Sequence, residues 1–140
     1  MKKDDFLKDA SFVDTLKKGG VNANDELRGI AMTQGMVLTP ILATPADVKT
    51  QTIPAQNGQP ARTFAYIDTK EEVRLSVTAL TRRGNGIKKT STKVMDAFAE
   101  VAERISTHPE YQLRVDNLYS RPGNNGNMQH QAVFTELNAE

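Results

Sequence analysis

The chain has 140 residues, the length of one ordinary domain, and its 18 Lys and Arg against 17 Asp and Glu leave a formal net charge of +1. A domain of this size buries roughly two-thirds of the surface that its unfolded chain exposes, so a single core can hold it together without disulfides or metals. Cysteine is absent, which excludes disulfides, thiolate nucleophiles and zinc–thiolate sites, and the balanced charge argues against a protein that coats duplex nucleic acid.

The N-terminal segment predicts a helix over residues 4–18, because apolar residues recur there near helical spacing until Gly19-Gly20. Aspartates lie in its first turn and lysines in its last, where each favours the helix dipole. A second, short helix is expected from Asn24-Asp25 to near Gly35. The opening sequence lacks the apolar centre of a secretory signal, and no apolar run approaches the roughly 20 residues that cross a bilayer, so we expect no membrane partner.

A projecting hairpin is predicted next. Prolines 40 and 45 break any helix and confine a strand to an edge or an end. Asn57-Gly58 favours a type I′ turn, and Pro54 and Pro60 remove two ladder donors near the tip. The expected cross-strand partners are Ile53 with Arg62, Gln51 with Phe64, and Lys49 with Tyr66. Because neither face of this ribbon is cleanly apolar, we expect an arm that projects from the body and is only partly buried by it.

The second half of the chain reads as strands around one helix. EEVRLSVTAL (71–80) alternates apolar and polar residues, which predicts a half-buried strand, and TRRGNGIKKTS reads as a basic connector. Residues 92–106 carry an amphipathic stripe of Val94, Phe98, Val101 and Ile105. Ser91 or Thr92 can cap this helix, and Pro109 forbids its continuation.

Two further strands close the chain, and a polar loop at 120–129 separates them. The first contains Tyr111, Leu113 and Val115, and the second is HQAVFTEL. We therefore predict one α+β domain over residues 1–140. It has a helical N-terminal segment (1–35) and a single antiparallel or mixed sheet (36–140) that carries the hairpin and is packed by one amphipathic helix at 92–106.

Residues suited to catalysis or metal binding form no recognisable constellation. His108 and His130 have no second histidine or acid at metal-ligand spacing, and no nucleophile-elbow motif occurs. Glu71-Glu72 and the pair Glu100/Glu103 read as solvated faces. We therefore expect a non-enzymatic protein with no catalytic, metal or cofactor site.

The basic segment at 82–93 leaves three alternatives open. It matches neither phosphate-binding glycine motif. Its charged residues are Arg82, Arg83, Lys88, Lys89 and Lys93, which is five positive charges without an acid among them. The loop is a solvated surface, a contact to a partner protein, or a site for single-stranded nucleic acid in which Tyr66, Phe64 and Tyr119 stack on bases.

Residues 71–137 resemble a known family in the order of their elements. The segment begins with an alternating strand (EEVRLSVTALTRR), which a polar loop connects to an Ala-rich helix (TSTKVMDAFAEVAERI). Two strands follow the helix: one that enters an arginine-containing loop (YQLRVDNLYSRPG) and one that begins with H-Q (MQHQAVFTEL). This order is similar to the tail-terminator and tail-completion (neck) proteins of long-tailed bacteriophages. Those proteins are small α+β subunits that close into rings, with a helix on one side of a curved sheet and hairpins that reach adjoining subunits.

The resemblance implies a structural assembly protein of the virion, present in the host cytoplasm during assembly. Its partners would be further copies of itself and other virion proteins such as the tail tube or connector. Three tips would make the contacts: the 120–129 loop, the 54–60 hairpin tip and the 82–89 loop, with Arg121 as the main anchor. The interface residues expected on this basis are Asn57, Arg62, Arg82, Arg83, Lys88, Lys89, Arg121 and Asn124. The alternative is a single-stranded nucleic-acid-binding module that uses Arg82, Arg83, Lys88, Lys89, Lys93, Tyr66 and Tyr119.

Overall fold

The structure is a computed structural model that describes residues 2–18, 32–55, 58, 60–85, 88–89, 96–122 and 128–139. Its helices are α1 (Lys3–Leu7), α2 (Ala10–Lys18), the 3-10 turn η1 (Pro45–Asp47), α3 (Val77–Leu80) and α4 (Ala97–Thr107). Its strands are β1 (Val37–Leu38), β2 (Lys49–Ile53), β3 (Arg62–Ile67), β4 (Leu75–Ser76), β5 (Arg83–Asn85), β6 (Lys88–Lys89), β7 (Gln112–Pro122) and β8 (Met128–Leu137).

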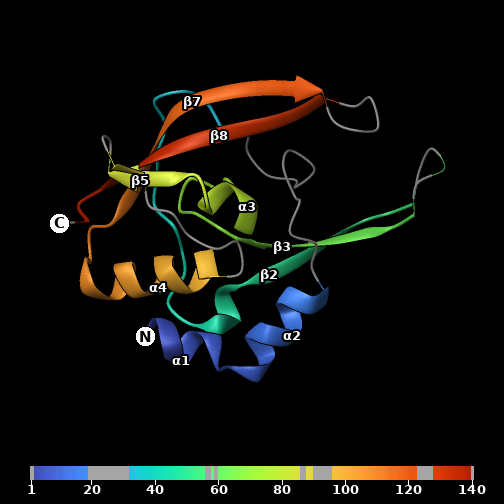
Figure 1. The fold of residues 1–140 in the computed structure, drawn as a ribbon, viewed down its shortest axis with the longest axis horizontal. Helices are drawn as coiled ribbons and strands as arrows, with labels where there is room; N and C mark the ends of the chain where they lie inside the picture. Colours follow the sequence, from blue (N-terminus) through green and yellow to red (C-terminus); the bar gives the residue numbers. More distant parts are fainter. Residues whose placement is uncertain are drawn as a thin grey trace.

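The predicted α+β class is confirmed, but the strands form two sheets where one was expected. The larger sheet has the order β1-β7-β8-β5-β6 and is mixed, because β5 runs parallel to β8; the smaller has the order β2-β3-β4. The two sheets are linked through the segment after β1, where Pro40 bridges Thr69 just beyond β3. Helices α1, α2 and α4 lie on one side of the molecule and the β7–β8 hairpin on the other (Figure 1).

The N-terminal helix is divided in two, and Asp9 explains the division. Its carboxylate accepts a hydrogen bond from the Phe12 backbone N–H at 2.9 Å, so it caps a new helix, α2. The break lets Phe6 and Phe12 meet edge to face at 4.5 Å, and Phe12 meets Phe98 of α4 at 6.4 Å. These rings anchor the N-terminal helices to α4. Residues 19–31, where most of the expected second helix falls, lie outside the described residues, and no helix appears at 32–35.

The β2–β3 hairpin has the predicted register. Its cross-strand pairs include Ile53 with Arg62, Gln51 with Phe64, and Lys49 with Tyr66. Gly58 has φ +78°, the left-handed backbone that the expected turn requires. The hairpin extends outward from the rest of the molecule (Figure 1).

The strand predicted at 71–80 is wrong over most of its length. Only Leu75–Ser76 is extended, and Val77–Leu80 forms α3, whose first turn Ser76 caps by accepting the Ala79 N–H at 3.1 Å. Val73, Leu75, Val77 and Leu80 are all buried, so the segment contributes to the core on either side of the point where the strand gives way to the helix. The basic connector after it is also not a loop throughout, because β5 and β6 within it pair as antiparallel strands.

Helix α4 and the last two strands follow the prediction more closely. Phe98 and Val101 are fully buried and Ile105 packs against the core, whereas Val94 and the expected caps lie outside the described residues. The prediction of a loop over residues 120–129 is wrong at both ends, because β7 continues to Pro122 and β8 begins at Met128. Only residues 123–127 fall between the two strands, and they lie outside the described residues. No described helix is both long and apolar enough to cross a membrane.

Candidate functional site

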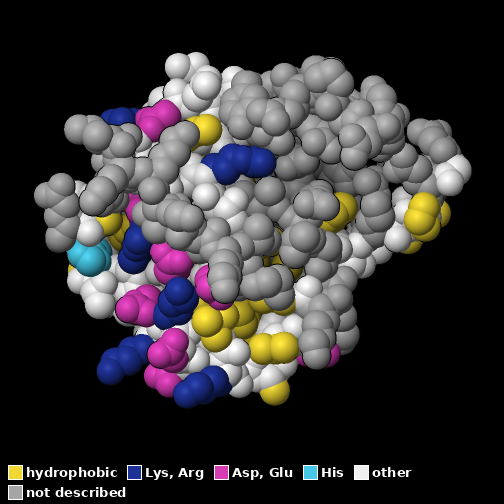
Figure 2. All heavy atoms as spheres, viewed as in Figure 1, with side chains coloured by type: hydrophobic (Ala, Val, Ile, Leu, Met, Phe, Trp, Pro, Cys, Tyr) yellow, Lys and Arg dark blue, Asp and Glu magenta, His cyan; other side chains and the backbone are white. Residues whose placement is uncertain are grey.

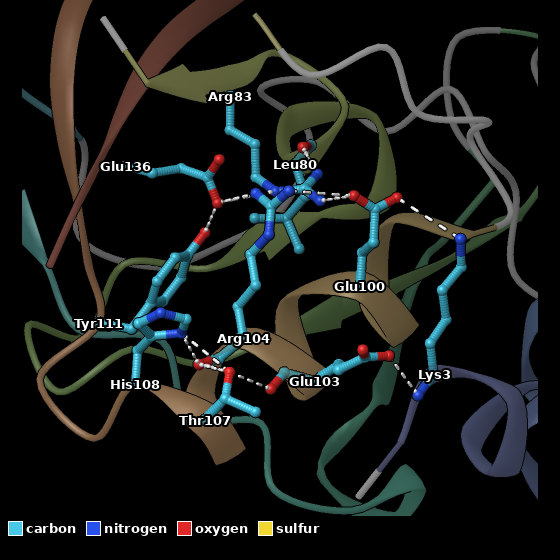
Figure 3. A network of polar contacts seen from close by, with 10 residues as sticks. All are labelled: Lys3, Leu80, Arg83, Glu100, Glu103, Arg104, Thr107, His108, Tyr111 and Glu136. Carbon is cyan, nitrogen blue, oxygen red and sulfur yellow. Dashed lines mark hydrogen bonds and ion pairs between the residues drawn. The ribbon is translucent and has the colours of Figure 1, made fainter. Parts of the chain in front are cut away.

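A buried network of charges joins β5, β8 and α4 (Figure 3). The side chains of Arg83 and Glu136 have no exposed surface, and Arg83 Nε lies 3.5 Å from Glu136 Oε2. Arg83 also donates to the Leu80 carbonyl at 2.7 Å and to Glu100 Oε1 at 2.9 Å. One guanidinium thus ties the end of α3, helix α4 and strand β8 together.

Glu136 is the centre of the network because one of its oxygens has three partners. Besides Arg83, Oε2 accepts hydrogen bonds from Arg104 Nη1 and from the Tyr111 hydroxyl, the latter at 2.6 Å. Burial, with the negative charge of Glu136 beside the ring, raises the pKa of Tyr111 far above its usual range, so the phenol keeps its proton. Burial alone would lower the pKa of Arg104, but the Glu136 carboxylate outweighs it and raises that pKa.

The N-terminus of α1 joins the same network. The Lys3 backbone N–H donates to Glu103 Oε2 at 2.7 Å, and Lys3 Nζ lies 3.8 Å from both Glu100 and Asp96. These ion pairs hold α1 against α4 next to the aromatic contacts. At the other end of α4, His108 Nδ1 contacts Thr107 Oγ1 at 2.8 Å and lies 3.2 Å from the Arg104 carbonyl, so its ring is engaged at the helix terminus.

This network has the chemistry of a structural clamp. Two of its buried atoms, Arg83 Nε and Glu136 Oε1, have no hydrogen-bond partner among the residues that the structure describes, and both belong to side chains without exposed surface. An open groove of about 870 Å³ lies between the end of α4 and the end of β8, with His108 and Glu110 among its lining residues. Within the described part of the chain, no three His, Asp or Glu side chains are placed to hold a metal ion.

Two hairpins extend beyond the sheets that hold their bases. The first, here called the β2–β3 arm, is the ribbon from Lys49 to Ile67; β4 pairs only with Tyr66 and Ile67 at its base. The second, the β7–β8 arm, comprises Asn117–Pro122 paired with Met128–Val133.

Neighbouring strands reach only the base of the β7–β8 arm. On the outer side of β7, β1 pairs with Leu113 and Arg114 only; on the outer side of β8, β5 pairs with Phe134 and Thr135 only. Both arms are therefore two-stranded over most of their length, as far as the described residues show.

The β2–β3 arm is uncharged from Thr50 to Ala61. Near its tip Pro54, Ala55, Pro60 and Ala61 are exposed. Figure 2 shows a small group of apolar side chains at the outer end of this arm, and it shows basic and acidic side chains mixed over the region of α1 and α4. The arm therefore presents polar uncharged and small apolar groups to its surroundings.

Ion pairs fix the base of the β2–β3 arm. Lys49 Nζ lies 2.6 Å from Asp68, and Arg74 donates to Gln51 and stacks over the Tyr66 ring at 4.8 Å from its centroid. Tyr66 is only 7% exposed. The expectation that Tyr66 offers a stacking face to bases is therefore wrong, because its ring is buried and Arg74 already covers it.

The residues predicted for a contact surface have different outcomes. The prediction that Arg83 contacts a partner is wrong, because its guanidinium is fully buried in the clamp. Arg82 is half-buried, and Lys88 and Lys89 form the edge strand β6, which pairs with Asn85 and Gly84 of β5. Arg62, Tyr119 and Arg121 lie in the paired strands of the two arms, opposite Ile53, Gln131 and Gln129. Asn57, Lys93 and Asn124 lie outside the described residues.

The sequence did contain a signal for the clamp. Glu136 follows Ala132 and Phe134 at two-residue spacing, which places a carboxylate on the buried face of a strand. A buried acid requires a cation nearby, and Arg104 stands four residues after Glu100 on the helix. No protein-family model, curated protein or solved structure matches this chain.

Proposed function

We propose that the protein is a non-enzymatic assembly subunit that forms a homo-oligomeric ring at the tail or neck of a bacteriophage particle. Its partners in this proposal are further copies of itself and a tail-tube or connector protein, and it acts in the virion after assembly in the host cytoplasm. The observation that carries the proposal is the pair of two-stranded arms. The bacteriophage setting rests on the resemblance of residues 71–137 alone.

Strand edges explain why such arms favour assembly. A two-stranded ribbon is marginally stable in water on its own, and its outer edges present unpaired N–H and C=O groups. A strand from another chain satisfies these groups, and side-chain pockets then set specificity. Two arms on one small subunit supply two such edges, which is the minimum for contacts that propagate from copy to copy and close.

The test is the mass and shape of the purified protein. Native mass spectrometry over a range of concentrations, with negative-stain electron microscopy, should show closed oligomers of one size. Incubation with isolated phage tails that lack their terminal ring should then deplete the protein from solution, and bovine serum albumin at the same concentration is the control. A strict monomer at every concentration overturns the proposal, and closed rings that ignore the tails overturn its bacteriophage part.

A second candidate is a module for single-stranded nucleic acid. The observation that favours it is the placement of Lys88 and Lys89 in an edge strand that pairs with β5, the strand that follows the half-buried Arg82. Fluorescence anisotropy with a labelled oligonucleotide at two salt concentrations tests it, because phosphate contacts weaken with salt. Binding that is lost when these three residues become alanine supports this candidate. Arg83 is left intact, since its loss would disturb the clamp.

A further inference from the structure

The outer side of β7 has no described partner strand over most of the β7–β8 arm. β1 and the residue before it reach only as far as Val115, whose N–H donates to the Met36 carbonyl at 2.8 Å. The pairing of β7 with β8 shifts register between Val115 and Asn117, and beyond that point no described strand pairs with the other side of β7. β7 lies along the upper border of the molecule in Figure 1, with β8 between it and β5. The stretch Asn117–Arg121 is therefore a free strand edge as far as the described residues show.

This free stretch is complementary to itself when two copies run antiparallel. Its only charged residue, Arg121, stands at one end. An antiparallel pairing centred on Tyr119 places Arg121 opposite Asn117 of the other copy, and the two Arg121 positions are then about 13 Å apart along the strands. A parallel pairing in register would place them directly opposite each other, which is destabilising for like charges. The nearest acid, Asp116, is paired with Arg114 at 2.8 Å, so that end of the edge carries no net charge.

We infer that the β7 edges of two copies pair antiparallel about a two-fold axis at Tyr119, so that this edge is a dimer interface. The two arms then form one sheet in the order β8-β7-β7-β8. A two-stranded ribbon is marginally stable in water, whereas three or more strands with an apolar face are stable together. Leu118 packs against the core but is only half-buried in one copy, and the added strand covers more of its surface.

This pairing needs only two copies, so it does not depend on the proposed ring. A two-fold contact uses the same surface on both copies and stops at a dimer. The proposed ring therefore requires a second contact elsewhere on the subunit. A ring that uses both contacts contains an even number of copies.

Substitutions of Asn117 test the pairing through charge, because Asn117 is exposed and faces Arg121 of the other copy in this register. Asn117→Asp introduces two opposite-charge pairs per dimer and should lower the Kd of dimerisation by roughly fivefold, whereas Asn117→Lys should raise it by a similar factor. Sedimentation velocity over a range of concentrations measures each Kd, and circular dichroism confirms that each variant is folded. The matched controls are Ser11→Asp and Ser11→Lys, at an exposed position on α2, which should leave the Kd unchanged. Equal Kd values for the two Asn117 variants overturn the pairing.

Cysteine cross-linking tests the register, because the chain has no cysteine of its own. Directly opposite residues of an antiparallel pair lie about 4.5–5.5 Å apart between Cα atoms, which a disulfide can span. Mild oxidation should therefore convert Tyr119→Cys into a covalent dimer. The same oxidation should leave Asn117→Cys as single chains on a denaturing gel, because the two Asn117 positions are about 13 Å apart along the strands. Covalent dimers from Asn117→Cys and none from Tyr119→Cys overturn the inference.

The results separate failure of this contact from failure of the ring. An unchanged protein that is a monomer at every concentration overturns both. Dimers that respond to the Asn117 substitutions as expected but never close into rings support the pairing and overturn the ring. Closed rings that assemble equally well in both Asn117 variants overturn the pairing and leave the proposed function standing.

Discussion

Replacing Arg83 by methionine retains a long side chain but removes the guanidinium from the centre of the clamp. The variant loses the 2.7 Å hydrogen bond to the Leu80 carbonyl, the 2.9 Å bond to Glu100 and the 3.5 Å ion pair with Glu136. Glu136 keeps Arg104 and Tyr111 but remains fully buried with less positive charge nearby. The perturbation therefore leaves a carboxylate undercompensated in the core.

The expected loss of unfolding free energy is large. Removing one partner of a buried ion pair costs about 3–5 kcal/mol, and an unpaired buried carbonyl costs about 1–3 kcal/mol. The two overlap because they belong to one network, so we expect about 4 kcal/mol in total. Domains of this kind have about 5–15 kcal/mol of stability in all, so the variant should be folded but fragile. With a slope of about 2 kcal/mol per molar urea, the midpoint should fall by about 2 M.

The control is Arg114→Met, which removes an arginine from an exposed pair at 2.8 Å with Asp116. Such surface pairs contribute at most about 1 kcal/mol. Adding Glu136→Gln to Arg83→Met should cost less than the sum of the two single changes, since the second change removes the stranded charge. Equal urea midpoints for Arg83→Met and Arg114→Met, or strict additivity in the double variant, would refute the assignment of a buried clamp.

Three further predictions concern other parts of the fold. The pKa of Tyr111 is raised from 10.0 in the folded protein, so the protonated phenol stabilises the fold fully below pH 10, and this stabilisation is lost as the pH rises above 10. The urea midpoint of Tyr111→Phe should therefore fall less at alkaline pH than that of the unchanged protein. Phenolate absorbance should show that Tyr111 ionises only when the protein unfolds. Glu72 is exposed with φ 65°, so Glu72→Gly should raise the thermal midpoint by the equivalent of about 1 kcal/mol, whereas Glu110→Gly should not. Phe6 is fully buried, so Phe6→Ala should cost about 3–5 kcal/mol and speed proteolysis of the N-terminal helices, whereas Asp5→Ala should change neither.

Local turn chemistry is what made the β2–β3 hairpin predictable. A two-residue turn fixes register by counting outward from its centre, so Asn57-Gly58 alone determines that Ile53 faces Arg62. The prediction of a strand over residues 71–80 was wrong because no turn residue fixes the local structure there. The apolar residues at 73, 75, 77 and 79 alternate with polar ones and so favour a strand, but the cap from Ser76 and the surrounding core produce a helix from Val77.

The clamp was harder to predict because its members are distant in sequence. Arg83 stands in a basic, glycine-bearing stretch that reads as a solvated loop, and nothing local shows that Glu136 will lie beside it. The parallel pairing of β5 with β8 creates that proximity, and it depends on the topology of the whole sheet. The division into two sheets escaped prediction for the same reason. Local propensity and turn residues indicate where strands form, whereas core packing determines which strands pair with one another.

Buried and partly buried ion pairs lie at the bases of both arms. Arg83 and Glu136 fix the base of β8 against α4, and Lys49, Asp68 and Arg74 fix the base of the β2–β3 arm. Both arms thus leave the body from ion-paired anchors, so their directions are set before any partner arrives. If the proposed ring forms, anchored arms lower the entropy that association must overcome. Under that proposal the clamp contributes to assembly indirectly, because it fixes the base of the β7–β8 arm against α4.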